Sequence, residues 1–457
     1  MNLTEKEILL AVEGVLVNGI NETIQVTSVE FDTRKVTTGS LFIPLKGNRD
    51  GHDFIEQAME KGASLVLSEH DLSSQIPYIK VDDTLRAMQH LAVFYLRKIG
   101  PKVVGITGSN GKTTTKDMTA AVLSTTYATY KTQGNFNNDI GLPYTILSMP
   151  ENTEMLVLEM GMDHKDEITV LSKIATPDVA AITLIGESHL EHLGSRKGIA
   201  EAKMEIIDGL KPEGTLIIPN NEPLLKEMIM DVNQTVESFG IDSEATLSAT
   251  ILSEEKSETR FSVNRYPDEI FAIPVLGKYN VSNALIALLV GRFFHVDIQN
   301  MRKSLATFDL TKNRTQWLQT ASGIDILSDV YNANPTAMGL VLDTFSDISV
   351  EGKKIVVLGD MLELGELSRK MHEGMSEHLS PEAIDEVYLY GPQMEFLAEK
   401  LQSTFSVNTL HYFPKEDKNN LMNKLSENLN PKDTVFLKAS NGMGLSEVVE
   451  FLLRSHQ

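Results

Sequence analysis

The sequence predicts an α/β protein of three domains: a small N-terminal α/β domain, a central domain of the P-loop type with a mainly parallel sheet, and a C-terminal Rossmann-like domain. Three observations lead to this fold class. At 457 residues the chain is longer than one hydrophobic core usually serves. From about residue 100 onward, short apolar runs alternate with loops and helical segments, as buried parallel strands do. One of these runs leads into a glycine-rich loop and a helix-like segment at residues 105–118.

The domain boundaries follow from shifts in pattern along the chain. Residues 1–99 mix β-like runs, such as SLFIPLKG and ASLVLSE, with helical patterns and end in the turn-prone IGPK. The opening MNLTEKEILLAVEGVL carries acidic side chains where a secretory signal needs a basic start, so we expect an amphipathic helix there. We expect domains at 1–99, 100–313 and 314–457, with a hinge at Thr311–Asn313.

Two series of strands are expected after the first boundary. The central domain should form strands at KVVGITGS, MLVLEMG, VAAITLIG and GTLIIPNN. The C-terminal domain should form them at IDILSDV, KIVVLGD, EVYLYG and DTVFLKAS. None of the second series is followed by GxGxxG, so the third domain gives no sign of binding NAD.

The composition narrows the classes of partner. The formal net charge of −22 repels phosphate backbones and anionic lipids over most of the surface, so nucleic acid is not an expected partner. The chain has no cysteine, which excludes disulfides, thiolate zinc sites and cysteine nucleophiles. Its strongest apolar stretch, Ala284–Val290, is too short to span a bilayer. We expect a monomeric, cytoplasmic protein without stable membrane insertion.

The segment GITGSNGKTTTKDM predicts a phosphate-binding loop. Gly108 and Gly111 let the backbone approach an anion, Lys112 supplies a charge at the terminal phosphates, and Thr113 offers a hydroxyl to Mg²⁺. The usual pattern GxxxxGK[ST] would place glycine where the chain has Ile106. The sequence lacks the N-K-x-D motif with which GTP-binding proteins read their base, which favours ATP over GTP.

Three further residues are candidates for metal or catalytic chemistry. Glu159 ends the run MLVLEMG, where a parallel strand delivers side chains to the ligand edge of its sheet. His189 would reach the same edge, or else lie in a surface loop. Lys203 lies in the helical pattern IAEAKMEIIDGL, and the residues alone favour a solvated side chain there.

Taken together, these motifs resemble those of the Mur ligases, which build the cytoplasmic peptide of peptidoglycan by ATP-driven amide formation. The family pattern T-G-x-x-G-K-T accounts for Ile106. GNFNNDIGLP resembles a substrate-side loop of the family and implicates Asn135 and Asn138. The resemblance implies that ATP is bound by the loop residues Thr107, Gly108, Ser109, Asn110, Gly111, Lys112, Thr113 and Thr114.

The resemblance also implies two Mg²⁺ ions. Thr113 and Glu159 would serve one ion, and His189 and Lys203 would serve the second. Family lysines at the position of Lys203 react with CO₂ to form a carbamate, which would turn a cation into an anionic oxygen ligand suited to Mg²⁺. Lys112, His189 and Lys203 are the implied catalytic residues.

Two more segments carry implied nucleotide contacts. GKYNVSNALIAL resembles a segment that approaches adenine and implicates Asn280 and Asn283, whose alternative role is helix capping. Arg314, in KNRTQW, matches a nucleotide-contacting arginine. DTRKVTTGSLFIPLKGNRDGHDF resembles a uridine-nucleotide-binding segment, although its residues alone would indicate a solvated surface. It implicates Asp32, Thr33, Arg34, Lys46 and Gly47.

The branch of the family is indicated by SDVYNANPTAM and VVLGDMLELG, which look like the D-alanyl-D-alanine-adding branch. Asp329, Tyr331, Asn332 and Asn334 are thus candidates for binding the dipeptide or for ordering the nucleotide. The implied reaction joins D-alanyl-D-alanine to UDP-N-acetylmuramoyl-tripeptide through an acyl phosphate, with the last domain closing over ATP. The alternatives are another Mur-type or folylpolyglutamate-type amino acid ligase, or a P-loop ATPase switch. No motif distinguishes lysine from diaminopimelate as the third residue of the acceptor peptide.

Overall fold

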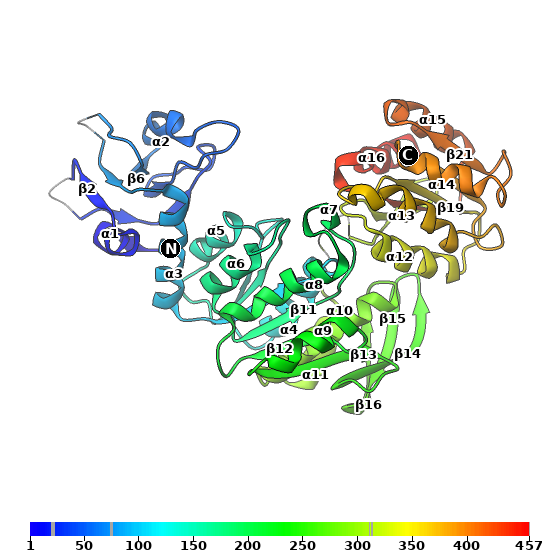
Figure 1. Cartoon of the computed structure of the whole chain (residues 1–457), viewed down its shortest axis with the longest axis horizontal. Helices are drawn as coiled ribbons and strands as arrows, with labels where there is room; N and C mark the ends of the chain where they lie inside the picture. The colour runs from blue at the N-terminus through cyan, green and yellow to red at the C-terminus, as the bar shows by residue number, and fades with distance from the viewer. Residues whose placement is uncertain (20–22, 74–75, 310, 312–313, 457) are drawn as a thin grey trace.

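A computed structural model describes residues 1–19, 23–73, 76–309, 311 and 314–456. The N-terminal and C-terminal parts of the chain lie on different sides of a central α/β body (Figure 1). The expected mixed α/β architecture with mainly parallel sheets is confirmed. None of the helices within the described ranges is both long and apolar enough to cross a membrane.

The N-terminal part is built on a five-stranded sheet with the order β2-β7-β6-β5-β4. The expected first helix is shorter than the apolar pattern suggested, because the chain turns at Glu13, whose φ of 53° is left-handed. A capping box between Thr4 and Glu7 fixes its start. The elements are β1 Leu3–Thr4, α1 Glu5–Val12, β2 Val15–Val17, β3 Gln25–Val26, β4 Ser28–Glu30, β5 Ser40–Phe42, α2 Ile55–Glu60, β6 Ala63–Ser68, β7 Tyr78–Lys80 and α3 Thr84–Ile99.

The central sheet has nine strands in the order β16-β15-β14-β13-β12-β11-β8-β10-β9. The four runs expected to form strands are β8, β10, β11 and β12, and all are parallel. The elements are β8 Lys102–Thr107, α4 Lys112–Ser124, β9 Thr129–Lys131, α5 Gly141–Ser148, β10 Met155–Glu159, α6 Glu167–Ala175, β11 Val179–Ile182, α7 Leu190–Leu193, α8 Arg196–Met204, β12 Thr215–Pro219, α9 Pro223–Met228, β13 Thr235–Ile241, β14 Leu247–Glu255, β15 Glu258–Val263, β16 Tyr266–Ile273, α10 Lys278–Phe293 and α11 Ile298–Leu305.

The two faces of this sheet are covered by different helices. Side chains alternate along each strand, so Val104 and Ile106 pack with α4, α10 and α11, whereas Val103 packs in the cluster that includes α5, α6 and α8. Helix α3 joins the second cluster, which therefore connects the N-terminal part with the central sheet. Burial on both faces explains why the parallel strands are continuous apolar runs. The strands β14 to β16, which pair antiparallel with one another, were not expected from the sequence.

The C-terminal sheet has six strands in the order β17-β18-β22-β19-β20-β21, parallel except for β17. The four expected strands are β18, β19, β20 and β22. Helices α12 to α14 cover one face, and α15 and α16 cover the other. The elements are β17 Gln316–Gln319, β18 Asp325–Asp329, α12 Pro335–Asp347, β19 Lys354–Gly359, α13 Ser368–Gly374, β20 Glu386–Tyr390, α14 Met394–Leu401, β21 Leu410–Phe413, α15 Lys418–Asn428, β22 Thr434–Lys438 and α16 Ser446–Ser455.

Candidate active site

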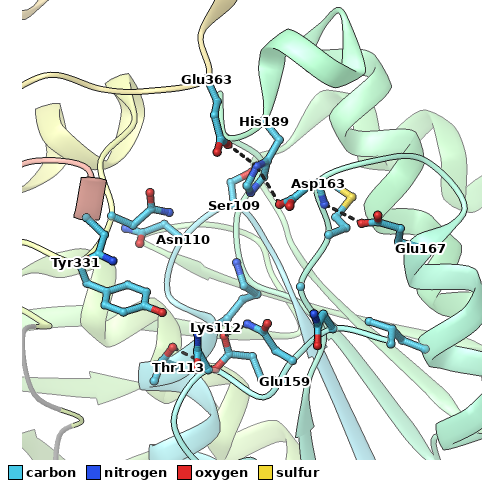
Figure 2. Close-up of a pocket in the computed structure, with 18 of the residues that line it drawn as sticks. Ser109, Asn110, Lys112, Thr113, Glu159, Asp163, Glu167, His189, Tyr331 and Glu363 are labelled. Atoms are coloured by element: carbon cyan, nitrogen blue, oxygen red, sulfur yellow. Dashed lines mark hydrogen bonds and ion pairs between the residues drawn. The ribbon is translucent and has the colours of Figure 1, made fainter. Parts of the chain in front are cut away.

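A cavity of about 810 Å³ lies at the carboxyl edge of the central sheet, where parallel sheets usually bind ligands (Figure 2). Loops that follow β8, β10 and β11 line it, and residues of the C-terminal domain complete it. It therefore joins segments that are far apart in the sequence. The expected site residues that line it are Ser109, Asn110, Gly111, Lys112, Thr113, Asn135, Asn138, Glu159, His189, Arg314, Tyr331 and Asn332.

The loop between β8 and α4 has the form of an anion-binding site. Gly108 and Gly111 have φ of 148° and 79°, and an added Cβ would lie 1.8 Å from the Thr183 hydroxyl or 2.6 Å from Asn283 Oδ1. Lys112 Nζ donates to the Gly108 carbonyl at 2.6 Å, and burial lowers the pKa of Lys112 while the charge of Glu159 opposes this. Because α4 begins at Lys112, its free N–H groups point out of the same loop, which fits a phosphate.

Glu159 is the buried acid of the site, with 2% of its surface exposed. Its Oε2 accepts from the Thr113 hydroxyl at 3.0 Å and its Oε1 accepts from Asn137 Nδ2 at 3.0 Å. These two neutral donors are its side-chain partners, and among the described residues it forms no ion pair, although a buried carboxylate normally has a cationic partner. The carboxylate and hydroxyl oxygens are the donors that Mg²⁺ prefers, so these residues fit a divalent cation.

His189 lies at the mouth of the cavity, between the central and C-terminal domains (Figure 2). Its Nδ1 is 2.6 Å from Glu363 Oε2 and 3.2 Å from Asp163 Oδ1. These are ion-pair distances, but neither contact has the angles of a regular hydrogen bond. Burial lowers the pKa of His189, the charge of Glu363 opposes this, and the charge of Lys112 adds to it. A neutral imidazole, the form that binds metals, is therefore favoured.

Lys203 is buried near the end of α8, with 2% of its surface exposed, so the solvated side chain that the residues alone favoured is wrong. The helical pattern could not show that the face carrying Lys203 packs against the sheet. Burial, with a smaller contribution from the charge of Lys112, lowers the pKa of Lys203 well below its ordinary value. Within the described part of the chain Lys203 has no ion pair.

A smaller cavity of about 20 Å³ is lined by residues of the loop between β8 and α4, by Thr114 of α4 and by Asp329 of the C-terminal domain. Asn280 and Asn283 line it, and both lie inside α10, whose N-cap is Gly277, so the capping alternative is wrong for them. Asn283 Oδ1 accepts from the Thr115 hydroxyl at 3.1 Å, which ties α10 to the loop helix.

The C-terminal domain contributes a cation stacked on an aromatic ring. The Arg314 guanidinium lies 4.0 Å from the centre of the Tyr331 ring. Asn332 has its carbonyl held by Lys438 Nζ at 2.9 Å. Asn334 caps α12 by accepting from Ala337 N at 2.9 Å, and its Nδ2 donates to the Ser188 hydroxyl at 2.9 Å. It therefore bridges the central and C-terminal domains.

The N-terminal segment that resembles a uridine-nucleotide-binding segment does not contribute its expected site residues to this cavity. Arg34 pairs with Asp32, and this pairing holds the pKa of Asp32 at about 2. Lys46 pairs with Glu69. Of the described residues that line the cavity, none is Asp32, Thr33, Arg34, Lys46 or Gly47.

Among the residues of the site that were not expected from the sequence, three contact the expected residues Glu159 and His189. Asn137 lies within the quoted segment GNFNNDIGLP, and Asp163 follows β10 at the same sheet edge as Glu159. Glu363 lies in VVLGDMLELG, a segment from which only the branch of the family was inferred. The expected hinge lies outside the described residues except for Thr311, whose hydroxyl donates to Asp117 at 2.7 Å.

Three family models match the chain. They are the Mur ligase family, catalytic domain, at residues 25–95, the Mur ligase middle domain at 106–291, and the Mur ligase, glutamate ligase domain, at 313–441. Together they match well over half of the chain.

Relatives and solved structures match over nearly the whole length. A UDP-N-acetylmuramoyl-tripeptide--D-alanyl-D-alanine ligase of Bacillus subtilis is 45% identical, with 99% of this chain and 98% of the relative covered. The crystal structure I of MurF from Acinetobacter baumannii has a TM-score of 0.90 at 27% identity, with 99% of both chains covered. A MurF ligase from Thermotoga maritima in complex with ADP has a TM-score of 0.83 at 28% identity, with 94% and 98% covered. This chain belongs to the Mur ligase family.

Proposed function

We propose that the protein is an ATP-dependent carboxylate-amine ligase that joins D-alanyl-D-alanine to UDP-N-acetylmuramoyl-tripeptide and releases ADP and phosphate. The observation that carries the proposal is the meeting of a phosphate loop, a buried carboxylate and residues of the C-terminal domain in one cavity. The names of the relatives, at identities up to 45%, support the choice of substrates.

The proposed chemistry solves a specific difficulty. A carboxylate is a poor electrophile, so it is first activated by accepting the γ-phosphoryl group of ATP to give an acyl phosphate. The free amine of D-alanyl-D-alanine then attacks the acyl carbon, and phosphate leaves as the amide forms. Lys112 and the loop amides hold the phosphates in line and neutralise the charge that develops, so no protein nucleophile is required.

The residues fit bound Mg²⁺, which would neutralise phosphate charge and orient the transferring group. Thr113 and Glu159 are the proposed ligands of one ion, and His189 and Lys203 of the second. Burial favours the neutral amine of Lys203, and a neutral amine is the form that attacks CO₂ to give a carbamate and a proton. The lowered pKa of Lys203 thus supports the proposed carbamate.

The remaining assignments concern the substrates and the setting. We propose that Asp32, Thr33, Arg34, Lys46 and Gly47 bind the uridine nucleotide, and that the tripeptide passes Asn135 and Asn138 to reach the cavity. Asn280, Asn283 and Arg314 are the proposed adenine and nucleotide contacts. We propose domain boundaries at 99/100 and 313/314, a monomer, and a location in the cytoplasm, where ATP is available.

The decisive experiment measures phosphate release with Mg-ATP, UDP-N-acetylmuramoyl-tripeptide and D-alanyl-D-alanine, omitting each component in turn, with the product mass determined. We expect release only with all components, and a UDP-muramoyl-pentapeptide product. The Lys112→Ala variant should stay folded and lose on the order of 10²- to 10³-fold in rate. Phosphate release that does not depend on either peptide substrate would instead indicate an ATPase switch. Phosphate release supported by another amine would indicate a different ligase of the family.

A further inference from the structure

The loop that follows β19 reaches across the domain interface to His189. Glu363 is the residue that makes this contact, through both its side chain and its backbone. Its Oε2 lies 2.6 Å from His189 Nδ1, and its carbonyl accepts from Glu191 N at 3.1 Å. Figure 2 shows Glu363 and Asp163 approaching the imidazole from opposite domains.

Both partners have backbone conformations that are unfavourable for residues with a side chain. Glu363 has φ of 62° and His189 has φ of 59°. Left-handed conformations in residues other than glycine persist where the surrounding structure imposes them, and they concentrate at functional sites. Two such residues are in contact across this interface, which makes the contact a candidate for a functional role.

The loop is braced so that Glu363 is presented in this position. Met361 N donates to Nε2 of the fully buried His372 at 2.9 Å, and Leu362 N donates to the Ser440 hydroxyl at 2.9 Å. The Nδ1 of His372 is 2.7 Å from the Ser368 carbonyl and donates to it. These bonds fix the two residues before Glu363, while the Glu363 side chain is free of the loop and extends to His189.

We propose that Glu363 is a positioning residue that holds the His189 ring for cation binding, so that divalent-cation binding and docking of the C-terminal domain reinforce each other. The proposal rests on the proposed function in taking His189 as a cation ligand. A negative charge 2.6 Å from Nδ1 favours the proton on that nitrogen, even without the angles of a regular hydrogen bond, and leaves the Nε2 lone pair for the cation. Asp163 supplies a similar charge from within the central domain, but only Glu363 makes the site depend on the C-terminal domain.

The first test measures binding of Mn²⁺ to the full chain, with a non-hydrolysable ATP analogue, from the electron paramagnetic resonance of free Mn²⁺. Glu363→Ala should weaken one Mn²⁺ site by about 10- to 100-fold, the usual effect of losing a partner that orients a metal-binding histidine. His189→Ala should remove the same site. Glu366→Ala, in the same loop and exposed, is the matched control and should bind Mn²⁺ as the wild type does.

The second test measures docking. Because the chain has no cysteine, Lys173→Cys and Lys400→Cys can carry a single pair of fluorophores on the exposed surfaces of α6 and α14. Mg²⁺ should increase the docking equilibrium constant of the wild type, and Glu363→Ala should reduce this increase, because the coupling between cation binding and docking is reciprocal.

The outcomes separate this proposal from the proposed function. Unchanged Mn²⁺ binding in Glu363→Ala, together with loss in His189→Ala, overturns the positioning role alone and leaves the ligase intact. Unchanged binding in His189→Ala overturns both the positioning role and the proposed second metal site. A Glu363→Ala variant that binds Mn²⁺ weakly but docks normally overturns the coupling.

Discussion

Two buried lysines, one in the central domain and one in the C-terminal domain, show two ways in which a buried amine is accommodated. Lys203 and Lys438 are each almost wholly buried, at 2% and 1% exposed; Lys203 lies near the end of α8, and Lys438 is the last residue of β22. Lys438 forms an ion pair with Asp329 and donates to the Asn332 carbonyl at 2.9 Å. Lys203 has no such partner within the described residues, and the nearby charge that acts on it is the positive one of Lys112.

The difference teaches how to separate structural from functional buried charges. A buried charge that is paired and hydrogen-bonded is compatible with a stable fold, and breaking the pair is costly. A buried amine that has no anion costs stability and persists only if something outside the chain compensates for it. We therefore expect Lys438 to support the fold and Lys203 to support the reaction.

The sharpest test of this difference is Lys203→Met, which keeps the volume and removes the amine. The ligation rate should fall on the order of 10²- to 10³-fold, as for loss of a group that stabilises developing charge. The free energy of unfolding should not fall, because no ion pair is broken. Phosphate release and urea unfolding measure the two quantities. Lys197→Met, on the exposed side of α8, is the matched control, and a large loss of stability in Lys203→Met would contradict the comparison.

Lys438→Met should, by contrast, lower the free energy of unfolding. It leaves Asp329 buried without its partner, which should reduce the free energy of unfolding by about 3–5 kcal/mol. Adding Asp329→Asn to Lys438→Met should recover a large part of this loss, since the unpaired charge disappears. Urea unfolding of the single and double variants measures the effect, with the exposed Lys400→Met as control. Equal stability of Lys438→Met and the wild type would show that the pair is not structural.

Asp360 tests whether backbone hydrogen bonds can replace a counter-ion for a buried carboxyl group. Asp360 accepts from Gln393 N and Met394 N at 3.1 and 3.0 Å, yet burial raises the pKa of Asp360 to about 6. An acid with a raised folded pKa binds its proton more tightly in the folded state. The resulting stability is present below about pH 4 and is lost as the pH rises through about 6.

Asp360→Asn should therefore remove a pH-dependent cost while keeping an oxygen that accepts both hydrogen bonds. Between pH 4 and 7 its stability relative to the wild type should rise by about 2 kcal/mol, the order that the raised pKa implies. Urea unfolding at a series of pH values measures this difference. The exposed Asp385→Asn should show no such rise, and a difference for Asp360→Asn that does not vary with pH would show that folding does not raise the pKa of Asp360.

The local pattern of apolar residues predicted many of the strands, and the features that it did not predict have a physical cause in common. The strands β8, β10, β11 and β19 are buried on both faces, so each contains a continuous apolar run. The burial of Lys203 and the position of Glu363 depend on how distant segments pack, which no local pattern encodes. The strands β14 to β16 were missed because exposed and partly buried side chains interrupt their apolar residues, so none of them appears as a continuous apolar run.

The ion pair of Arg34 with Asp32 is exposed, so its loss should have the smallest effect on stability among these charges. The Arg34 side chain is 85% exposed, and an ion pair in water contributes little to stability because solvent screens it and both side chains lose freedom. Arg34→Ala should therefore unfold at the same urea concentration as the wild type. If the segment binds the uridine nucleotide as proposed, the KM for that substrate should rise about tenfold, the effect of one lost charge-assisted hydrogen bond, with kcat unchanged.

Lys61→Ala, which removes an exposed lysine that donates to the Thr33 carbonyl, is the control for a disturbed segment. A rise in KM in both variants would indicate distortion of the segment, whereas a rise in Arg34→Ala alone would indicate a direct contact.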